Sequence, residues 1–437
     1  MHRTLVIIKT IQLLSQKTLT QEKKTLVYNI ASLFFLQGVN YLLPFLSMPY
    51  LTRVLGPESF GILSFYQSLT QFFMIFADYG FYLLAPREIA IVRDRADLLN
   101  RGFSEFFFAK LLLFCFIAFL YSSLVLFVPR FEQNPQVGLL FLFMILGHAL
   151  FPQWYFQGIE KMHYIALGNF ISKFIFILPI FFIVTSPEDL FWVPLLWGGG
   201  YISAAIFGLT IAFVQEKARL QKVNAFAIFE KIRAGFPLFL SSLSSISYTS
   251  LTPVLLGLWS SHSEVALYTL ADRIVAIAKT TLQPLQQALY PYMARKVAFQ
   301  KERSYVALRA LFFFMGLIGL SMSLFLFLLS EEIVLLLGGG QFQKASPILA
   351  LLSIHPFLVA CSGVLGVQIL LNLGKNKLFA MILFSASVIH LVVMVFIVPS
   401  YAALGAAISV TMAELWVSLV MFFLVTKLGL FSKLAHV

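Results

Sequence analysis

Long apolar runs fill this sequence and limit what the chain can fold into. A helix that crosses a lipid bilayer needs about 20 consecutive, mostly apolar residues. We find about twelve such runs in the 437 residues. They cover residues 27–51, 60–84, 104–128, 137–158, 164–184, 190–214, 235–258, 265–291, 305–329, 347–371, 377–398 and 402–425. We therefore predict an all-α polytopic membrane protein with about 12 transmembrane helices.

The composition agrees with this fold class and argues against several others. The chain is 60% hydrophobic and 11% charged, whereas soluble domains carry about 25% charged residues. The net charge of +12 does not predict a nucleic-acid partner, because the basic residues lie in loops between apolar runs. Cys115 and Cys361 both fall in apolar runs, so we expect no disulfide and no metal site. No nucleotide-binding loop occurs, and we expect no cofactor.

The distribution of Lys and Arg predicts the orientation in the membrane. The loops around 85–103 and 215–234 are rich in both residues, whereas the opposite loops hold only Arg53, Arg130 and Lys344. Cytoplasmic loops carry the excess of positive charge. We therefore predict a multi-pass membrane protein with both termini in the cytoplasm.

The longest basic loop divides the chain into two similar halves. We expect the following units: a cytoplasmic extension at 1–26, an N-lobe of six helices at 27–214, a cytoplasmic linker at 215–234, a C-lobe of six helices at 235–426 and a cytoplasmic tail at 427–437. The outer loops reach at most about 17 residues, too short for an extramembrane domain with an active site. We therefore predict that the protein is not an enzyme.

The first two helices of each half carry polar stripes at helical spacing, which places each stripe on one helix face. In the N-lobe the stripes consist of Gln37, Asn40, Pro44 and Ser47, and of Ser64, Gln67, Gln71 and Asp78. In the C-lobe they consist of Ser241, Ser244, Tyr248 and Thr252, and of Arg273, Thr280, Pro284 and Gln287. A polar face inside a bilayer must meet protein or water rather than lipid. The stripes therefore predict two pseudo-symmetric six-helix lobes around a central wet cavity.

Three segments resemble a known family. They read LQGVNYLLPFLSMPYLTRVLGPESFG at 36–61, followed by ADYGF and REIA, and LYTLADRIVAIAKTTLQPLQQALYPYMAR at 267–295. They are similar to O-antigen and polysaccharide flippases of the multidrug/oligosaccharidyl-lipid/polysaccharide exporter superfamily, over about residues 24–430. The resemblance implies a location in the bacterial inner membrane, where an undecaprenyl-pyrophosphate-linked oligosaccharide moves across the bilayer by alternating access. It further implies contact with membrane lipids and, as candidate partners, a polysaccharide polymerase and chain-length proteins.

The stripes and the resemblance together give the candidate site residues. Arg273 lies about 12 Å below the outer end of its helix, and the resemblance implies that the Arg of ADR faces the cavity. The full set of candidate cavity residues is Arg273, Lys279, Arg53, Gln37, Asn40, Gln67, Gln71, Ser241, Ser245 and Tyr248. The candidates for ion coupling are Asp78, Asp272 and Glu414.

Other polar residues in the apolar runs receive structural interpretations. We expect Lys110 to extend to the inner surface and Glu105 to be solvated. Nothing in the pattern assigns Lys173, near mid-membrane, to the cavity, and we interpret His148 as a core residue. Three alternatives stay open: a lipid II flippase, a drug/cation antiporter of the same superfamily, and a non-transporting scaffold of a polysaccharide assembly complex.

Overall fold

The computed structural model of the chain describes residues 46–129, 134–246, 251–299 and 301–427. Within these ranges the protein is helical and contains no strand. A helical stretch at 46–78 precedes the labelled helices. The α-helices are α2 (Phe81–Val92), α3 (Ala96–Phe127), α4 (Pro135–Leu140), α5 (Leu142–Leu150), α6 (Gln153–Gly158), α7 (Met162–Ile183), α8 (Trp192–Thr210), α9 (Ala225–Ile246), α10 (Leu251–Trp259), α11 (His262–Thr281), α12 (Gln283–Phe299), α13 (Lys301–Leu328), α14 (Ser330–Gly338), α15 (Ser346–Leu352), α16 (His355–Gly363) and α17 (Asn376–Lys427). Short 3-10 turns, η2 (Pro187–Phe191) and η4 (Gly340–Ala345), and π-helical turns, η3 (Ile211–Gln215) and η5 (Val364–Leu371), connect or extend them.

The predicted all-α membrane fold is confirmed, although the number of spans stays a prediction. Eight described helical stretches are long and apolar enough to cross a membrane. Several of these stretches contain a break in the helical backbone, among them the breaks at Gly56 (φ 70°), at Phe151 (φ −66°, ψ 116°) and at Ala402 (φ 46°, ψ −124°). The break at Ala402 separates two helices at the place where the sequence predicts one span to end and the next to begin.

The predicted span 265–291 is interrupted. Helix α11 ends at Thr281, and α12 begins at Gln283. Pro284 is the second residue of α12. Proline has no N–H to donate, and its ring clashes with the carbonyl four residues earlier, so a continuous helix through this point is disfavoured. The polar stripe that the sequence places along one face is therefore divided between two helices.

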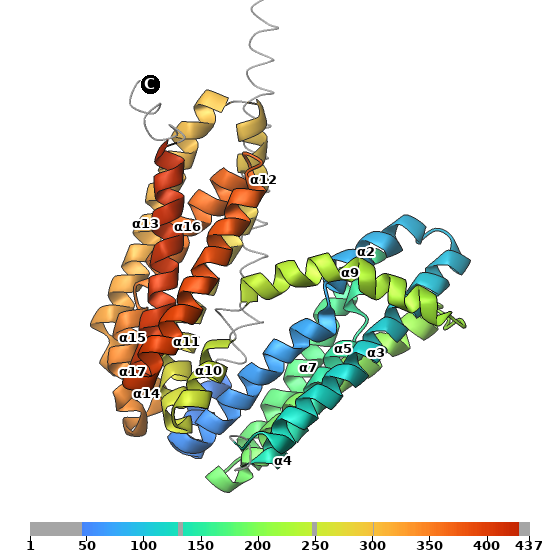
Figure 1. Cartoon of the computed structure of the whole chain (residues 1–437), viewed down its shortest axis with the longest axis horizontal. Coiled ribbons are helices and arrows are strands. Elements are labelled where there is room, and N and C mark those ends of the chain that lie inside the picture. Colours follow the sequence, from blue (N-terminus) through green and yellow to red (C-terminus); the bar gives the residue numbers. More distant parts are fainter. Residues whose placement is uncertain (1–45, 130–133, 247–250, 300, 428–437) are drawn as a thin grey trace, which may run out of the picture.

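The helices form two bundles that touch at one end and diverge at the other (Figure 1). The first bundle comprises residues 46–215, drawn in blue to green, and the second comprises residues 251–427, drawn in yellow to red. Helices α4, α10 and α14 lie at the end where the bundles meet, which we call the closed end. Helix α2 and the upper parts of α12 and α13 lie toward the opposite end, where α9 extends from the first bundle toward the second (Figure 1).

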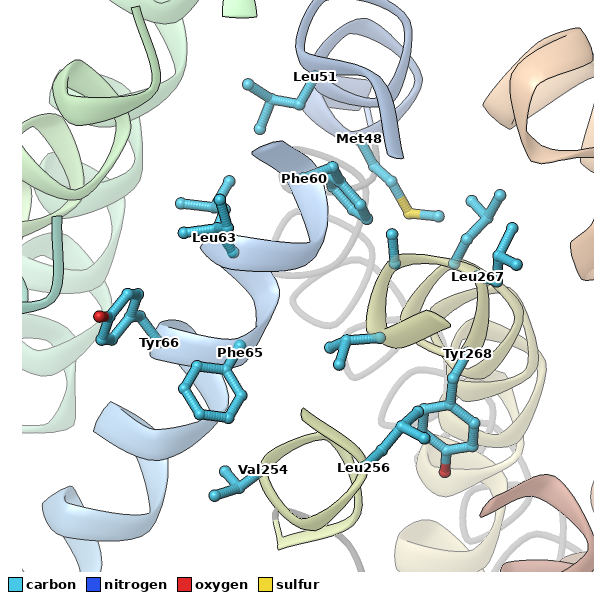
Figure 2. Packing of buried hydrophobic residues seen from close by; sticks show 14 of the residues in the cluster. Met48, Leu51, Phe60, Leu63, Phe65, Tyr66, Val254, Leu256, Leu267 and Tyr268 are labelled. Carbon is cyan, nitrogen blue, oxygen red and sulfur yellow. The ribbon is translucent and has the colours of Figure 1, made fainter. Parts of the chain in front are cut away.

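Two helical hairpins pack against each other at the closed end and hold the bundles together. The first is formed by residues 46–78, and the second by α10 and α11. Figure 2 shows Met48 and Phe60 of the first hairpin on the side of Leu267 in α11, and Phe65 on the side of Leu256 in α10. These side chains belong to one buried hydrophobic cluster.

Glycine permits the closest approach between the hairpins. A Cβ on Gly61 would lie 1.8 Å from the backbone oxygen of His262, and one on Gly257 would lie 2.3 Å from the Phe65 ring. Any larger residue at either position would force the helices apart. The close contact brings the 57–78 helix directly alongside α11.

Polar contacts reinforce the closed end. The Thr52 hydroxyl donates to the Leu337 carbonyl at 2.8 Å, and Arg53 Nη2 donates to the Leu336 carbonyl at 2.6 Å. Ser263 Oγ donates to Glu58 Oε2 at 2.7 Å. Each of these bonds joins the first bundle to the second, so they would have to break if the bundles separated here.

The predicted linker at 215–234 is partly helical, because α9 begins at Ala225. Lys231 of α9 pairs with Glu88 at 2.5 Å and with Glu105 at 3.3 Å. Arg101 also pairs with Glu105, at 3.0 Å. The expectation that Glu105 is solvated is therefore wrong: its residue is 7% exposed, and two cations satisfy its carboxylate. The lobe boundaries themselves remain a prediction.

Candidate substrate cavity

A cavity of about 540 Å³ lies above the closed end, with walls from both bundles. The first bundle contributes the 46–78 hairpin and helices α5 to α8, and the second contributes α11. The main polar residues of its described lining are Ser47, Gln67, Gln71, His148, Gln153, Asn169, Ser172, Lys173, Tyr201, Arg273 and Thr280. The predicted polar stripe of the second helix therefore faces the cavity through Gln67 and Gln71.

Arg273 reaches the cavity from α11 and also bridges the two bundles. Its Nη2 atom donates a hydrogen bond to Gln67 Oε1, and its guanidinium carbon lies 5.4 Å from the centre of the Phe60 ring. Ala276, Ile277 and Thr280 line the cavity from the same face of α11, as helical spacing requires. The guanidinium is therefore held by an amide and an aromatic ring, two partners without negative charge.

A second cation, Lys173, enters the cavity lining from α7. Asn169, Ser172 and Phe176 share its face, at the i−4, i−1 and i+3 positions. The sequence analysis did not assign Lys173 to the cavity. The signal that could have found it is the group Asn169–Ser172–Lys173, a short polar face in a helix whose other residues are mostly apolar.

His148 of α5 also lines the cavity, and it belongs to a polar network behind the wall. Its Nε2 atom lies 3.0 Å from Asp78 Oδ2, and Lys110 Nζ lies 3.2 Å from Asp78 Oδ1. The Lys110 side chain is 6% exposed. The expectation that Lys110 extends to the inner surface is therefore wrong, because the lysine is directed at Asp78 inside the first bundle.

The charge of the lining is positive. It contains Arg273 and Lys173, and none of the described lining residues is a carboxylate. Two fixed cations in a partly enclosed site favour an anionic ligand, because water screens their charge less there than at an open surface. The described residues contain no group of three or more side chains that could hold a metal ion.

The remaining predicted residues lie elsewhere or outside the described part of the chain. Arg53 sits at the closed end on the Leu336 carbonyl. Asp272 and Lys279 are half-buried on α11, and neither lines the cavity; Lys279 acts electrostatically on His355 and on the buried Glu414 of the second bundle. Gln37, Asn40 and Tyr248 lie outside the described residues, as do the side chains of Ser241 and Ser245. Their proposed roles in substrate binding or ion coupling remain predictions.

Known proteins are similar to this chain in sequence or in fold. A protein of Escherichia coli K12 described as an O-antigen transporter is 28% identical over 399 residues, covering 91% of this chain and 96% of that protein. The lipid II flippase MurJ in an inward closed conformation has a TM-score of 0.71 at 13% identity, covering 92% of this chain and 87% of that chain. An inward-facing multidrug resistance MATE family transporter of the MOP superfamily has a TM-score of 0.69 at 14% identity, covering 92% and 96%.

The two structural likenesses establish the shared transporter fold. The sequence profile of one family, polysaccharide biosynthesis protein, matches residues 26–297 of this chain, which is more than half of its length. This chain therefore belongs to the polysaccharide biosynthesis protein family.

Proposed function

We propose that the protein moves an undecaprenyl-pyrophosphate-linked oligosaccharide from the inner to the outer leaflet of the bacterial inner membrane by alternating access. The observation that carries this proposal is the cavity between the bundles, where Arg273 and Lys173 occur without a carboxylate among the described lining residues. An O-antigen or other surface-polysaccharide repeat unit is the proposed glycan. A polymerase and chain-length proteins that use the product outside are proposed partners.

The chemistry of the lining suits each part of such a headgroup. Guanidinium and ammonium groups bind phosphate oxygens through charge-assisted hydrogen bonds. Amides and hydroxyls such as Gln71, Asn169 and Tyr201 can exchange hydrogen bonds with sugar hydroxyls. The volume of about 540 Å³ lies within the range of about 300 to 1,000 Å³ that is usual for small-molecule sites.

The arrangement of the bundles supports alternating access. The predicted orientation places the closed end outside and the diverging end in the cytoplasm, where the lipid-linked sugar is made available. A cavity that is closed outside and approached from inside would then receive the headgroup first. If the bundles then separated at the closed end and met at the cytoplasmic end, the headgroup would be released to the outer leaflet.

The membrane potential can supply energy for this step. With the cytoplasm negative, outward movement of one negative charge releases about 2.3 kcal/mol per 100 mV. A pyrophosphate carries at least one such charge. The proposal therefore needs no nucleotide hydrolysis, in agreement with a sequence that lacks a nucleotide-binding loop.

Complementation tests the proposal. An Escherichia coli strain without its own O-antigen flippase should regain surface polysaccharide when it expresses this chain, provided that it makes a matching repeat unit. Arg273→Ala should abolish the rescue, and Arg273→Lys should retain part of it because the charge remains. Arg309→Ala is the matched control, because Arg309 is exposed on α13 and packs over Phe313.

Three outcomes would contradict the proposal. Drug resistance without polysaccharide export would favour a drug/cation antiporter. Rescue of a strain that lacks its lipid II flippase, without export of the repeat unit, would favour the lipid II substrate. No rescue by the wild-type chain, with the protein present at normal levels and bound to partner proteins, would favour a non-transporting scaffold. Full export by Arg273→Ala would exclude the proposed role of that residue.

A further inference from the structure

A second, smaller cavity adjoins the substrate cavity inside the first bundle. It has a volume of about 50 Å³, enough for a few water molecules. His148, Phe151 and Gln153 line both cavities. Asp78, Lys110 and Tyr82 line the small cavity alone. His148 therefore lies in the wall between a polar pocket and the proposed substrate site.

The contacts of His148 fix which ring nitrogen can take up a proton. Lys110 Nζ lies 3.2 Å from Asp78 Oδ1 and favours the ionised carboxylate. An ionised carboxylate only accepts hydrogen bonds, so the His148 Nε2 atom at 3.0 Å from Asp78 Oδ2 must carry a hydrogen. The other nitrogen, Nδ1, is the position at which a neutral imidazole can gain a proton and become a cation.

The charged and titratable groups around His148 act in opposite directions. Asp78 favours the imidazolium, whereas Lys110 of α3 opposes it. Tyr201 of α8, with its ring centre 6.4 Å from the imidazole, and Tyr82 of α2 are neutral near pH 7. Lys173 of α7 and Arg273 of α11, in the wall of the shared cavity, also oppose the imidazolium while no anion is present. An anion in that cavity would neutralise the effect of these two cations.

We propose that His148 takes up one proton when a diphosphate headgroup binds in the substrate cavity, so that the site gains a third cation only when it is occupied. This inference rests on the proposed function. The proton comes from solvent and forms a bond to His148 Nδ1, and no other covalent bond changes. Asp78 acts as a positioning residue, because it holds the ring through Nε2 and leaves Nδ1 for the proton.

Linkage gives the sign and size of the effect. If binding takes up a proton, then a lower pH must tighten binding by the same coupling. Histidine changes its charge between about pH 5 and 8. At full coupling the Kd changes about tenfold per pH unit, and we expect a total change of about 5- to 30-fold over this interval. The direction is tighter binding at acid pH.

The test uses the full chain in lipid nanodiscs and a short-chain polyprenyl-diphosphate-linked disaccharide. The diester phosphates of this probe keep a constant charge over the pH interval, so the probe itself contributes no proton. Calorimetry in two buffers of different ionisation enthalpy counts the protons taken up on binding. The wild-type chain should take up a fraction of a proton that rises toward one near neutral pH, and its Kd should increase with pH.

Three variants assign the proton to His148. His148→Gln should lose both the proton uptake on binding and the pH dependence of the Kd. Lys173→Gln should bind more weakly at every pH and should take up a smaller fraction of a proton on binding, because one of the two cations that oppose the imidazolium in the empty site is gone. His163→Gln is the matched control, because this exposed histidine begins α7 and lies outside both linings; it should behave as wild type.

The outcomes separate this inference from the proposed function. Tight binding of the probe without proton uptake by the wild-type chain would overturn the role of His148 and leave the flippase proposal in place. Proton uptake that persists in His148→Gln would do the same. Failure of the wild-type chain to bind the probe at any pH would overturn both. The wild-type proton count needs no variant, so misfolding of His148→Gln would not remove the test.

Discussion

Lys110 and Asp78 illustrate how a charged residue can be kept inside an apolar bundle. Lys110 stands in the middle of α3 among phenylalanines and leucines, with 6% of its side chain exposed. The cost of removing its ammonium group from water is offset by the Asp78 carboxylate. Asp78 in turn is shared with His148. The pair is therefore a place where loss of one partner leaves a charge without compensation.

We predict that Lys110→Met lowers the stability of the chain more than the loss of one lysine would at a surface. Loss of one member of a buried pair costs about 3–5 kcal/mol. Asp78 keeps its bond to His148 and is 34% exposed, so we expect about 1–3 kcal/mol here. Thermal unfolding of the purified chain in detergent measures the change. A double variant, Lys110→Met with Asp78→Asn, should recover part of it; an unchanged midpoint for Lys110→Met would show that the pair contributes little.

At the residue scale, the helical polar stripes predicted some of the residues that line the cavity. The others depend on tertiary contacts that the sequence pattern does not show. Gln67, Gln71 and Arg273 were predicted from their spacing, and all three line the cavity. Lys173 and His148 also line it, but whether each points into a cavity depends on which neighbouring helix it meets. That neighbour is set by packing between segments far apart in sequence, which a periodicity does not encode.

Helix α9 forms in part of a segment that the sequence predicts to be a loop. The sequence predicts a basic cytoplasmic linker at 215–234, and α9 begins within it at Ala225. Lys231 links α9 to α2 through Glu88 and to α3 through Glu105, and its ammonium group lies 5.2 Å from the centre of the Phe106 ring. These contacts attach the start of the helix to the first bundle.

We expect Lys231→Ala to loosen the start of α9. The exposed Phe226 and Phe229 in its first turns would then reach a protease more easily, because local opening exposes the backbone. Limited digestion with chymotrypsin should cut at these residues several times faster than in wild type. Glu230→Gln, an exposed change on the same helix, provides the comparison. Equal digestion rates in both variants would mean that the ion pairs of Lys231 do not hold the helix.

The predicted span 265–291, which is interrupted at Leu282, shows that the sequence pattern does not determine where a helix ends. The sequence assigns Arg273, Thr280, Pro284 and Gln287 to one face of a single helix. The structure keeps Arg273 and Thr280 together on the cavity wall and begins a new helix after Leu282. The proline that causes the interruption was visible in the sequence. Whether a membrane proline bends or ends a helix depends on the neighbours that satisfy the backbone.

For the whole molecule, the sequence predicted two lobes around a cavity but not which end would be closed. Which end is closed depends on a small difference in free energy between two arrangements of the same bundles, and a local sequence pattern does not indicate it. Besides the hydrophobic packing, hydrogen bonds join the bundles at the closed end, among them Ser263 to Glu58 and Thr52 to the Leu337 carbonyl. Such hydrogen bonds can be broken and remade, as alternating access requires.

We predict that a cross-link across the closed end stops transport. In a chain with Cys115→Ala and Cys361→Ala, the pair Glu58→Cys and Ser263→Cys would be joined by a short, reducible thiol reagent. Export should be lost on cross-linking and should return on reduction. The matched pair is Arg93→Cys with Glu160→Cys, whose native side chains lie 2.8 Å apart within the first bundle. Transport that continues with the closed end cross-linked would exclude opening at this contact.

Translocation in proteoliposomes tests the central claim most directly. The chain would be reconstituted into vesicles whose membrane contains a fluorescent polyprenyl-diphosphate-linked disaccharide. A membrane potential that is negative inside would favour outward movement of the anionic headgroup. Quenching of the fluorescence from outside would measure the fraction of the probe that has moved between the leaflets. The account predicts movement well above that in protein-free vesicles, and a loss of at least about tenfold for Arg273→Ala with Lys173→Ala. Movement by the double variant at the wild-type rate, or none by the wild-type chain, would contradict it.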